Sequence, residues 1–319
     1  MSDSAVVERK RFINNKNPNK IKSPNSLISD VVIYSVVGFL ALICLWPFLF
    51  VASMSVSSPE AVMTRSVWLF PVGPLTLNAY IRTIAIPLMW RSYLNTIIYV
   101  IIVCVLNLVI CAMAAYPLAM KGFRGRRFFV IFLMIPYFFG GGLIASFVTN
   151  VWLGLYNNPA IIILLSAFSI WNVILIRTYF HSSIPHTIKE AAIIDGAGDM
   201  TILFKIVAPL SKPIFAVVTL FNAVGMWNSY FNALIYVPNK DWQPLQLFVA
   251  RLLVLERDFI ASLQRGAGTM DTSRMMEGLT TAMQLKYAVI MFATLPIIFS
   301  YPFLQRYFIR GVLIGSLKE

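Results

Sequence analysis

Acidic residues are scarce in this 319-residue chain, and a long central part has none. Only 13 residues are Asp or Glu, against 26 Lys or Arg, and none of the 13 lies between Ala61 and Lys189. Charged residues make up 12% of the chain, whereas soluble domains have about 25%. Because 59% of the residues are apolar, too few polar side chains remain to cover a surface that faces water. The composition excludes a soluble enzyme and indicates a chain embedded in lipid.

Catalytic and metal-binding patterns are also missing. The sequence has no GxSxG, HExxH or GxxxxGK(S/T) motif, so nothing predicts a hydrolase, a zinc protease or a phosphate-binding loop. His181 and His186 have no Cys, Asp or Glu at zinc-ligand spacing, and no metal site is expected. Ion-coupled carriers usually keep an ionisable group at mid-membrane, and the apolar stretches after the first contain no carboxylate. If this chain moves a substrate, the energy must come from another protein.

Six stretches are long and apolar enough to cross a bilayer, which takes about 20 residues each. The predicted fold is therefore an all-α polytopic membrane protein with six transmembrane helices. A basic tail at 1–29, a six-helix domain at 30–305 and a tail at 306–319 are expected. The predicted spans cover approximately residues 30–55, 92–118, 128–149, 159–179, 208–236 and 286–305.

The basic residues predict the orientation of these spans. If both termini are cytoplasmic, 17 of the 26 Lys and Arg residues lie on the cytoplasmic side and nine on the outer side, as the positive-inside rule requires. A multi-pass protein of the cytoplasmic membrane is expected. The net charge of +13 is then explained by basic loops beside lipid, and nucleic acid is not expected as a partner.

The inner connection at 184–213 is the most informative segment. Its sequence predicts a helix, a turn at Gly196 and Gly198, and a second helix capped by Asp199. The segment lies outside the membrane yet carries apolar residues such as Ile193 and Ile194. Two interpretations stay open from the residues alone: a protrusion that docks into a cytosolic protein, or an amphipathic hairpin that lies on the inner leaflet or beneath its own bundle.

The spacing Glu-Ala-Ala-x3-Gly-x9-Ile-x-x-Pro in this connection resembles the EAA loop of permease subunits in bacterial ATP-binding-cassette importers. Ala208 stands where that family usually has Leu. The ending QRYFIRGVLIGSLK (305–318) is similar to the C-terminal signature of MalG-type permeases of carbohydrate importers, and FGGGLI (139–144) looks nearer to LplC/YtcP-like members. The motif residues that would couple the chain to an ATPase are Glu190, Ala191, Ala192, Asp195, Gly196, Ile206 and Pro209.

The resemblance implies a type I importer fold with a cytoplasmic coupling helix and a set of partners. The chain would be a non-catalytic permease that forms half of a sugar or oligosaccharide pathway. Its partners would be a second, different permease of the MalF/LplB kind, two copies of a cytosolic ATPase that uses ATP and Mg²⁺, and an extracytoplasmic solute-binding protein. No cofactor is expected in this chain.

Two further groups of residues are candidates for contacts with substrate and binding protein. Amides and aromatic rings suit sugars, which present hydroxyl groups and C–H faces, but polar residues in spans also bond to neighbouring helices. The long outer connection at 237–285 resembles in position the MalG loop that reaches into the binding protein, and it would otherwise be a solvated lid. The pathway candidates are Asn222, Trp227, Asn228, Tyr230 and Asn232, and the binding-protein candidates are Trp242, Arg251, Arg257 and Arg265.

Two other functions remain open at this point. A membrane scaffold would use the same connection to recruit a different cytosolic protein. A facilitator would move sugar with no ATPase at all.

Overall fold

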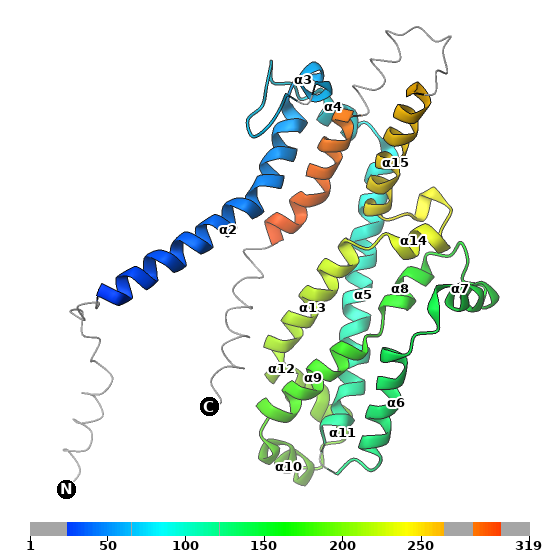
Figure 1. Ribbon diagram of the computed structural model, residues 1–319. Coiled ribbons are helices and arrows are strands. Elements are labelled where there is room, and N and C mark those ends of the chain that lie inside the picture. Colours follow the sequence, from blue (N-terminus) through cyan, green and yellow to red (C-terminus); the bar gives the residue numbers. More distant parts are fainter. Residues whose placement is uncertain (1–23, 65, 121, 265–282, 301–319) are drawn as a thin grey trace. The chain divides into compact units, whose positions relative to one another are not determined.

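A computed structural model describes residues 24–64, 66–120, 122–264 and 283–300, and every regular element in these ranges is a helix (Figure 1). The chain forms two compact units, residues 1–50 and residues 51–319, and each is described by itself. Residues 1–23 of the predicted basic tail and all of the predicted tail at 306–319 lie outside the described residues.

Helix α2 (Pro24–Val56) contains the first predicted span, and its residues up to Phe50 form the first unit. Large apolar side chains along this helix, from Ile28 to Leu49, are exposed. Its 33 residues span roughly 50 Å, more than the approximately 30 Å hydrocarbon core of a bilayer. A helix with large apolar side chains exposed on all sides suits lipid as its solvent.

The second unit is built around α5 (Pro87–Ala119), which packs most extensively on α13 (Lys212–Trp227) and α9 (Ile170–Ser183) (Figure 1). The buried positions of α5 include small and polar residues such as Ser92, Thr96 and Ala115, which let neighbouring helices approach closely. The exposed side chains in the middle of α5 are mostly aliphatic. This division of faces is typical of a helix packed on one side and bathed in lipid on the other.

By length and composition the described residues contain up to six spans, the number that the sequence predicts, but only three of them are single helices. Three helices are long and apolar enough to cross a membrane: Ile28–Val56, Pro87–Ala119 and Met283–Ser300. Three bent pairs complete the set of up to six. These pairs are α6 (Arg126–Phe138) with α7 (Gly142–Trp152), bent by 107°, α8 (Ala160–Ser166) with α9, bent by 42°, and Asp199–Leu210 with α13, bent by 83°.

The glycines of the third span break the helix between α6 and α7. Glycines that let two helices pack closely leave no room for a Cβ. A Cβ added at Gly140 or Gly142, however, would meet no atom within 4 Å. Gly142 has φ of +79°, a conformation open to glycine and costly for other residues. Within this chain the glycines therefore serve the bend and not a close contact.

Short helices fill the two ends of the second unit (Figure 1). One end carries α10 (His186–Ile194), α11 (Asp199–Thr201), the π-helix η1 (Ile202–Val207) and α12 (Ala208–Leu210). The other end carries α14 (Phe231–Tyr236), the 3₁₀-helix η2 (Lys240–Trp242) and α15 (Leu245–Gln264). The connection 56–91 is also folded there, with α3 (Pro59–Met63) and α4 (Asn78–Ile84).

Candidate functional site

The connection 184–213 folds as a helix, a tight turn and a second helical segment, as the sequence predicts. After α10 the Gly196 amide donates to the carbonyl oxygen of Ile193 at 3.0 Å, and Gly196 adopts φ of +79°. Only glycine takes this left-handed conformation without strain. The predicted cap is wrong in detail, because Gly198 precedes the second segment and Asp199 is its first helical residue.

The apolar residues of this connection divide between two surroundings. Ala192, Ile202 and Leu203 are 7%, 0% and 1% exposed and belong to a buried cluster with α5, α9 and α13. Ile193 and Ile194, by contrast, are 57% and 85% exposed. The segment is therefore packed beneath its own bundle on one side and presents an uncovered apolar tip on the other. The packing beneath its own bundle is therefore observed, and docking of the exposed tip into a cytosolic protein stays a prediction.

The predicted coupling residues lie mostly on the uncovered side. Ala191 and Ala192 are successive residues, about 100° apart around a helix, so they point in different directions. Ala192 is held in the core of its own chain, which leaves Ala191 open to a partner. Ile206 is half-buried against the same core cluster. The exposed members of the set are Glu190, Ala191, Asp195, Gly196 and Pro209.

The second segment contains a π-helix that the sequence did not predict. The wider turns of η1 run from Ile202 to Val207 and end just before Pro209, which has no amide hydrogen to donate. A bend of 83° follows at Ser211, where α13 begins. Short π-helical stretches are rare and are often found at functional positions. This one lies between the exposed tip and a long membrane helix.

Asn222 of the predicted pathway is instead part of a three-helix polar cluster. Its amide donates to Asn107 Oδ1 at 2.8 Å, and the Asn172 amide donates to the same oxygen at 2.8 Å. Asn172 also donates to Asn222 Oδ1 at 3.1 Å. The Asn107 amide donates to the carbonyl oxygen of Ser166 at 3.2 Å. In the sequence, Asn107 and Asn172 each stand among apolar residues of a predicted span. A polar residue in such a position favours hydrogen bonds between helices.

The other pathway candidates lie around a break that the sequence did not predict. α13 ends at Trp227 and α14 begins at Phe231, so the predicted span 208–236 is not one helix. Asn228 is exposed and bonds its own helix, Tyr230 is 43% exposed and Asn232 is half-buried. Asn228 and Asn232 are four residues apart, a spacing that would put them on one face of a continuous helix, but they lie on either side of this break.

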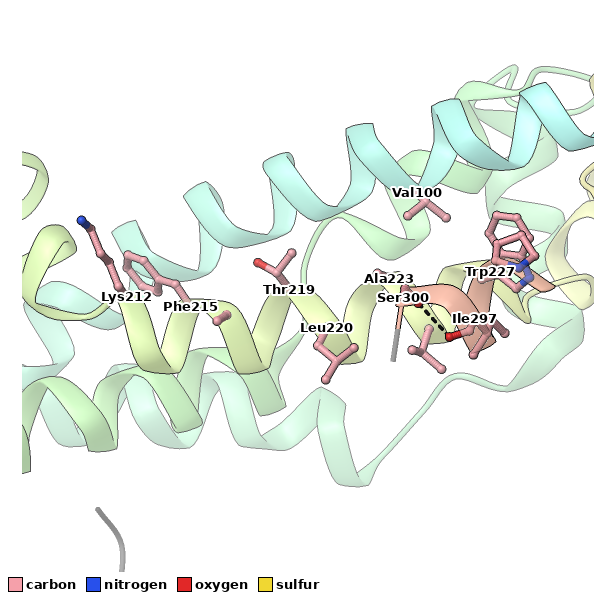
Figure 2. Close-up of a pocket in the computed structure, with 12 residues that line it drawn as sticks. Val100, Lys212, Phe215, Thr219, Leu220, Ala223, Trp227, Ile297 and Ser300 are labelled. Atoms are coloured by element: carbon pink, nitrogen blue, oxygen red, sulfur yellow. Dashed lines mark hydrogen bonds between the residues drawn. The ribbon is translucent and has the colours of Figure 1, made fainter. Parts of the chain in front are cut away.

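Trp227 is buried at 8% exposure and fixes the helix Met283–Ser300 to α13. Its indole nitrogen donates to the carbonyl oxygen of Ala293 at 3.0 Å, and its ring meets Tyr93 edge-on at 5.6 Å. Beside it an open cavity of about 660 Å³ runs along α13 toward Lys212 (Figure 2). The lining is almost wholly apolar, with Thr219 and Ser300 among its few hydroxyl groups.

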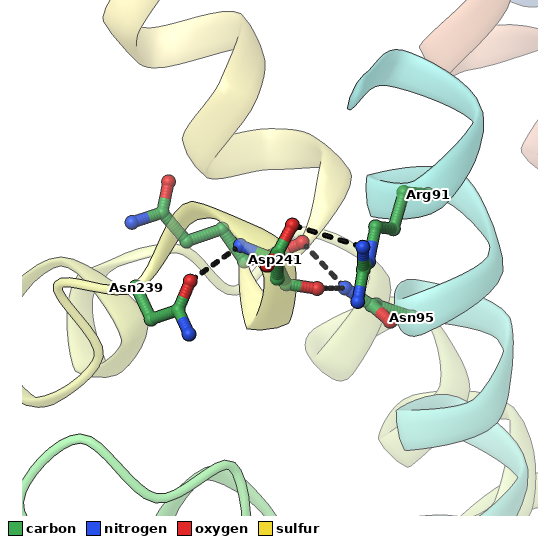
Figure 3. A network of polar contacts seen from close by, with 5 residues as sticks. Arg91, Asn95, Asn239 and Asp241 are labelled. Carbon is green, nitrogen blue, oxygen red and sulfur yellow. Dashed lines mark hydrogen bonds and ion pairs between the residues drawn. The ribbon is translucent and has the colours of Figure 1, made fainter. Parts of the chain in front are cut away.

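The connection 237–285 begins as a fixed platform, residues 237–244, held on the end of α5 (Figure 3). Asn95 is buried and donates to the carbonyl oxygens of Asp241 at 2.8 Å and Gln243 at 3.2 Å. Tyr99 donates to the Trp242 carbonyl at 2.8 Å. An exposed ion pair, Arg91 Nη1 to Asp241 Oδ1 at 3.0 Å, adds to the same contact. The backbone of the platform is thus satisfied by side chains of a membrane helix.

The binding-protein candidates are only partly described. Trp242 ends η2 on the platform and is 40% exposed. Arg251 is half-buried on α15. Arg257 lies on α15, while Arg265 lies outside the described residues. α15 begins directly after the platform, at Leu245, and continues to Gln264.

Comparisons with known proteins agree with this architecture. Residues 113–314 match the family described as binding-protein-dependent transport system inner membrane component. The chain is 33% identical to the polygalacturonan/rhamnogalacturonan transport system permease protein YtcP of Bacillus subtilis, over 91% of this chain and 98% of that protein. It is 32% identical to protein LplC of Bacillus subtilis, over 91% and 95% of the two chains.

A solved structure is similar over almost the same length. A chain in the crystal structure of a bacterial ABC transporter involved in the import of the acidic polysaccharide alginate superimposes with a TM-score of 0.78. The two chains are 33% identical, and the match covers 90% of this chain and 98% of the other.

Proposed function

This chain belongs to the family of binding-protein-dependent transport system inner membrane components, as a non-catalytic permease subunit of an importer, and we propose that its substrates are oligosaccharides. Two named relatives support this proposal, one for polygalacturonan and rhamnogalacturonan and one for alginate. The absence of Asp and Glu from residues 62–188 supports acidic sugars in particular, because the second to fourth spans carry no like charge to repel a uronate.

The proposed orientation places α10 and both termini in the cytoplasm. The basic residues of the loop at 121–127 and of the connection 184–213 support it, since α6 begins beside the first and α10 lies in the second. The platform at 237–244 then faces the outside, where a solute-binding protein would dock. Trp242 and Arg251 remain the described contact candidates, with Arg257 and Arg265 next to them in sequence.

The uncovered tip of α10 is the observation that carries the proposed coupling. Ile193 and Ile194 are apolar and exposed, and Glu190 and Ala191 lie on the same short helix. A groove on a cytosolic ATPase would bury these side chains. A movement of the ATPase would then shift α10. Ile202 and Leu203, on the buried side of the connection, would transmit this shift to the core of the bundle. The ATPase, in two copies, would use ATP and Mg²⁺, and this chain would hold no cofactor.

The second half of the pathway would come from a different permease. The apolar cavity beside α13 and the exposed Asn228 and Tyr230 are open to such a neighbour, and Asn232 is half-buried near them. Asn222 and Trp227 are assigned to helix packing instead, because each is engaged within this chain. Sugar would pass along the face that the two permeases share.

Co-purification tests this proposal directly. The Glu190→Arg variant should lose the ATPase from the detergent-solubilised complex, because the contact sits at the tip of α10. The matched control is Glu60→Arg, which reverses the same charge on an exposed residue of α3 at the opposite end of the unit. Retention that is equal in both variants would favour a scaffold for another protein. Sugar uptake by vesicles without any nucleotide would favour a facilitator.

A further inference from the structure

Lys189 is a buried cation that lacks a hydrogen-bond acceptor among the described residues. Its side chain is on α10 and is 3% exposed, and its Nζ atom has no hydrogen-bond acceptor there. Burial lowers the pKa of Lys189 below its ordinary value. A buried ammonium group of this kind costs several kcal/mol unless something accepts its hydrogen bonds.

The neighbouring residue Tyr116 also lacks a hydrogen-bond partner. Its hydroxyl group is buried and has no partner among the described residues, and Lys189 Nζ lies 5.9 Å from the centre of its ring. Both side chains line one cavity of about 630 Å³ between the end of α5 and the α10–α11 segment. Two neighbouring buried donors without acceptors, on residues that line one cavity, indicate a missing acceptor.

The position of the cavity along α5 points to the membrane surface. Tyr116 lies in the last turn of a span that ends at Ala119, which places it at the depth of lipid headgroups. A stripe of exposed aliphatic side chains leads down the same helix into the cavity, at helical spacings of four, three and four residues. The stripe consists of Ile102, Leu106, Val109 and Met113, and Met113 lines the cavity.

The rest of the lining suits a lipid and selects its headgroup. Met120 and Met200 supply flexible apolar surface for the upper part of an acyl chain. Asp199 also lines the cavity and would accept hydrogen bonds from an ammonium or hydroxyl group. Choline has neither kind of donor, whereas ethanolamine and glycerol headgroups have one.

We propose that this cavity binds the phosphate of a membrane phospholipid whose headgroup carries hydrogen-bond donors, with Lys189 and Tyr116 donating to the phosphate oxygens. The acyl chain would follow the aliphatic stripe of α5, and the headgroup donors would meet Asp199. By the orientation proposed above, the lipid belongs to the inner leaflet and contacts the coupling helix directly. The coupling helix would then sense lipid composition.

Photoactivatable lipids test this site in the complete importer. The complex is reconstituted in phosphatidylcholine nanodiscs that contain a trace of phosphatidylethanolamine with a diazirine on its acyl chain, and labelled peptides are mapped by mass spectrometry. Labelling should concentrate in residues 109–123. The Lys189→Gln variant should lower it by about tenfold, the scale of one charge-assisted hydrogen bond, and Tyr116→Phe by less.

Matched variants separate this site from general membrane contact. Lys205→Gln removes an exposed lysine of the same connection and should leave the labelling unchanged. Lys189→Arg keeps the charge and should retain most of the labelling. Equal labelling by a diazirine phosphatidylcholine, or labelling unaffected by Lys189→Gln, would overturn the proposal. So would carbodiimide coupling of Lys189 to an ATPase carboxylate together with no lipid labelling, because the cavity would then hold a protein side chain.

Discussion

The side-chain amide of Asn222 on α13 donates a 2.8 Å hydrogen bond to the side-chain oxygen of Asn107 on α5, 115 residues earlier in the chain. The Asn172 amide of α9 donates to that same oxygen at 2.8 Å. One buried oxygen therefore ties α5 to the two helices that pack on it most extensively, α9 and α13. A movement of any of them must carry the others or break a bond inside an apolar bundle.

Replacing Asn107 with Leu should weaken the bundle and leave substrate choice intact. The change removes the shared acceptor and leaves two amides without it, at a cost of about 1–3 kcal/mol in the free energy of unfolding. Unfolding of the purified chain in mixed micelles with increasing denaturant measures this cost. Asn228→Leu is the control, because Asn228 is exposed and bonds only its own helix. Equal stability of the two variants would contradict a clamp at Asn107.

The apolar runs predicted the spans, but polar contacts between residues far apart in the chain could not be predicted from the sequence. Six runs of sufficient length give six spans, and a Gly-x-Gly pair after a short helix gives the turn at Gly196. The assignment of Asn222 to packing depends on Asn107 and Asn172, which are distant in sequence and meet only in the folded bundle. Likewise, adjacent alanines look equivalent in sequence, and only the packing of Ala192 on the core distinguishes it from Ala191.

The break between α13 and α14 has a related explanation. No proline or glycine lies between Met226 and Asn232, so the strongest helix-breaking signals are missing, although Asn228 and Ser229 are weak helix formers. After the break, the platform at 237–244 is held on α5 by hydrogen bonds from Asn95 and Tyr99, which a continuous helix through 236 would not place there. Tertiary hydrogen bonds of this kind override propensity.

Loss of Asn95 should loosen the platform more than loss of Arg91. Asn95 is buried and its amide serves two carbonyl oxygens, so Asn95→Leu should cost about 1–3 kcal/mol of local stability. The side chains of Arg91 and Asp241 are 53% and 50% exposed, and Arg91→Gln should cost less than about 1 kcal/mol. Protease cleavage within residues 237–244 reports the difference. Faster cleavage in Arg91→Gln than in Asn95→Leu would reverse this ranking.

Gly196→Ala and Gly198→Ala should differ although both sites have room. A Cβ at either position meets nothing within 4 Å, but φ is +79° at Gly196 and −73° at Gly198. Alanine at Gly196 therefore carries a backbone cost of roughly 1–2 kcal/mol, and alanine at Gly198 carries none of this kind. ATP hydrolysis stimulated by the sugar-loaded binding protein should fall in the first variant and persist in the second. Equal hydrolysis in both would show that the turn does not need its left-handed residue.

Substitution of Ile194 and Ile202 should separate partner contact from folding. Ile194 is 85% exposed, so Ile194→Asp should leave the unfolding of the isolated chain unchanged while it weakens retention of the ATPase. Ile202 is fully buried, so Ile202→Ala should lower the free energy of unfolding by about 2–5 kcal/mol through the cavity it leaves. Both quantities are measured on each variant, by denaturant titration of the chain and by co-purification of the complex. If Ile194→Asp destabilised the isolated chain as much as Ile202→Ala, the tip of α10 would be packed within its own bundle. Intact ATPase retention in Ile194→Asp would place the partner contact elsewhere on the connection.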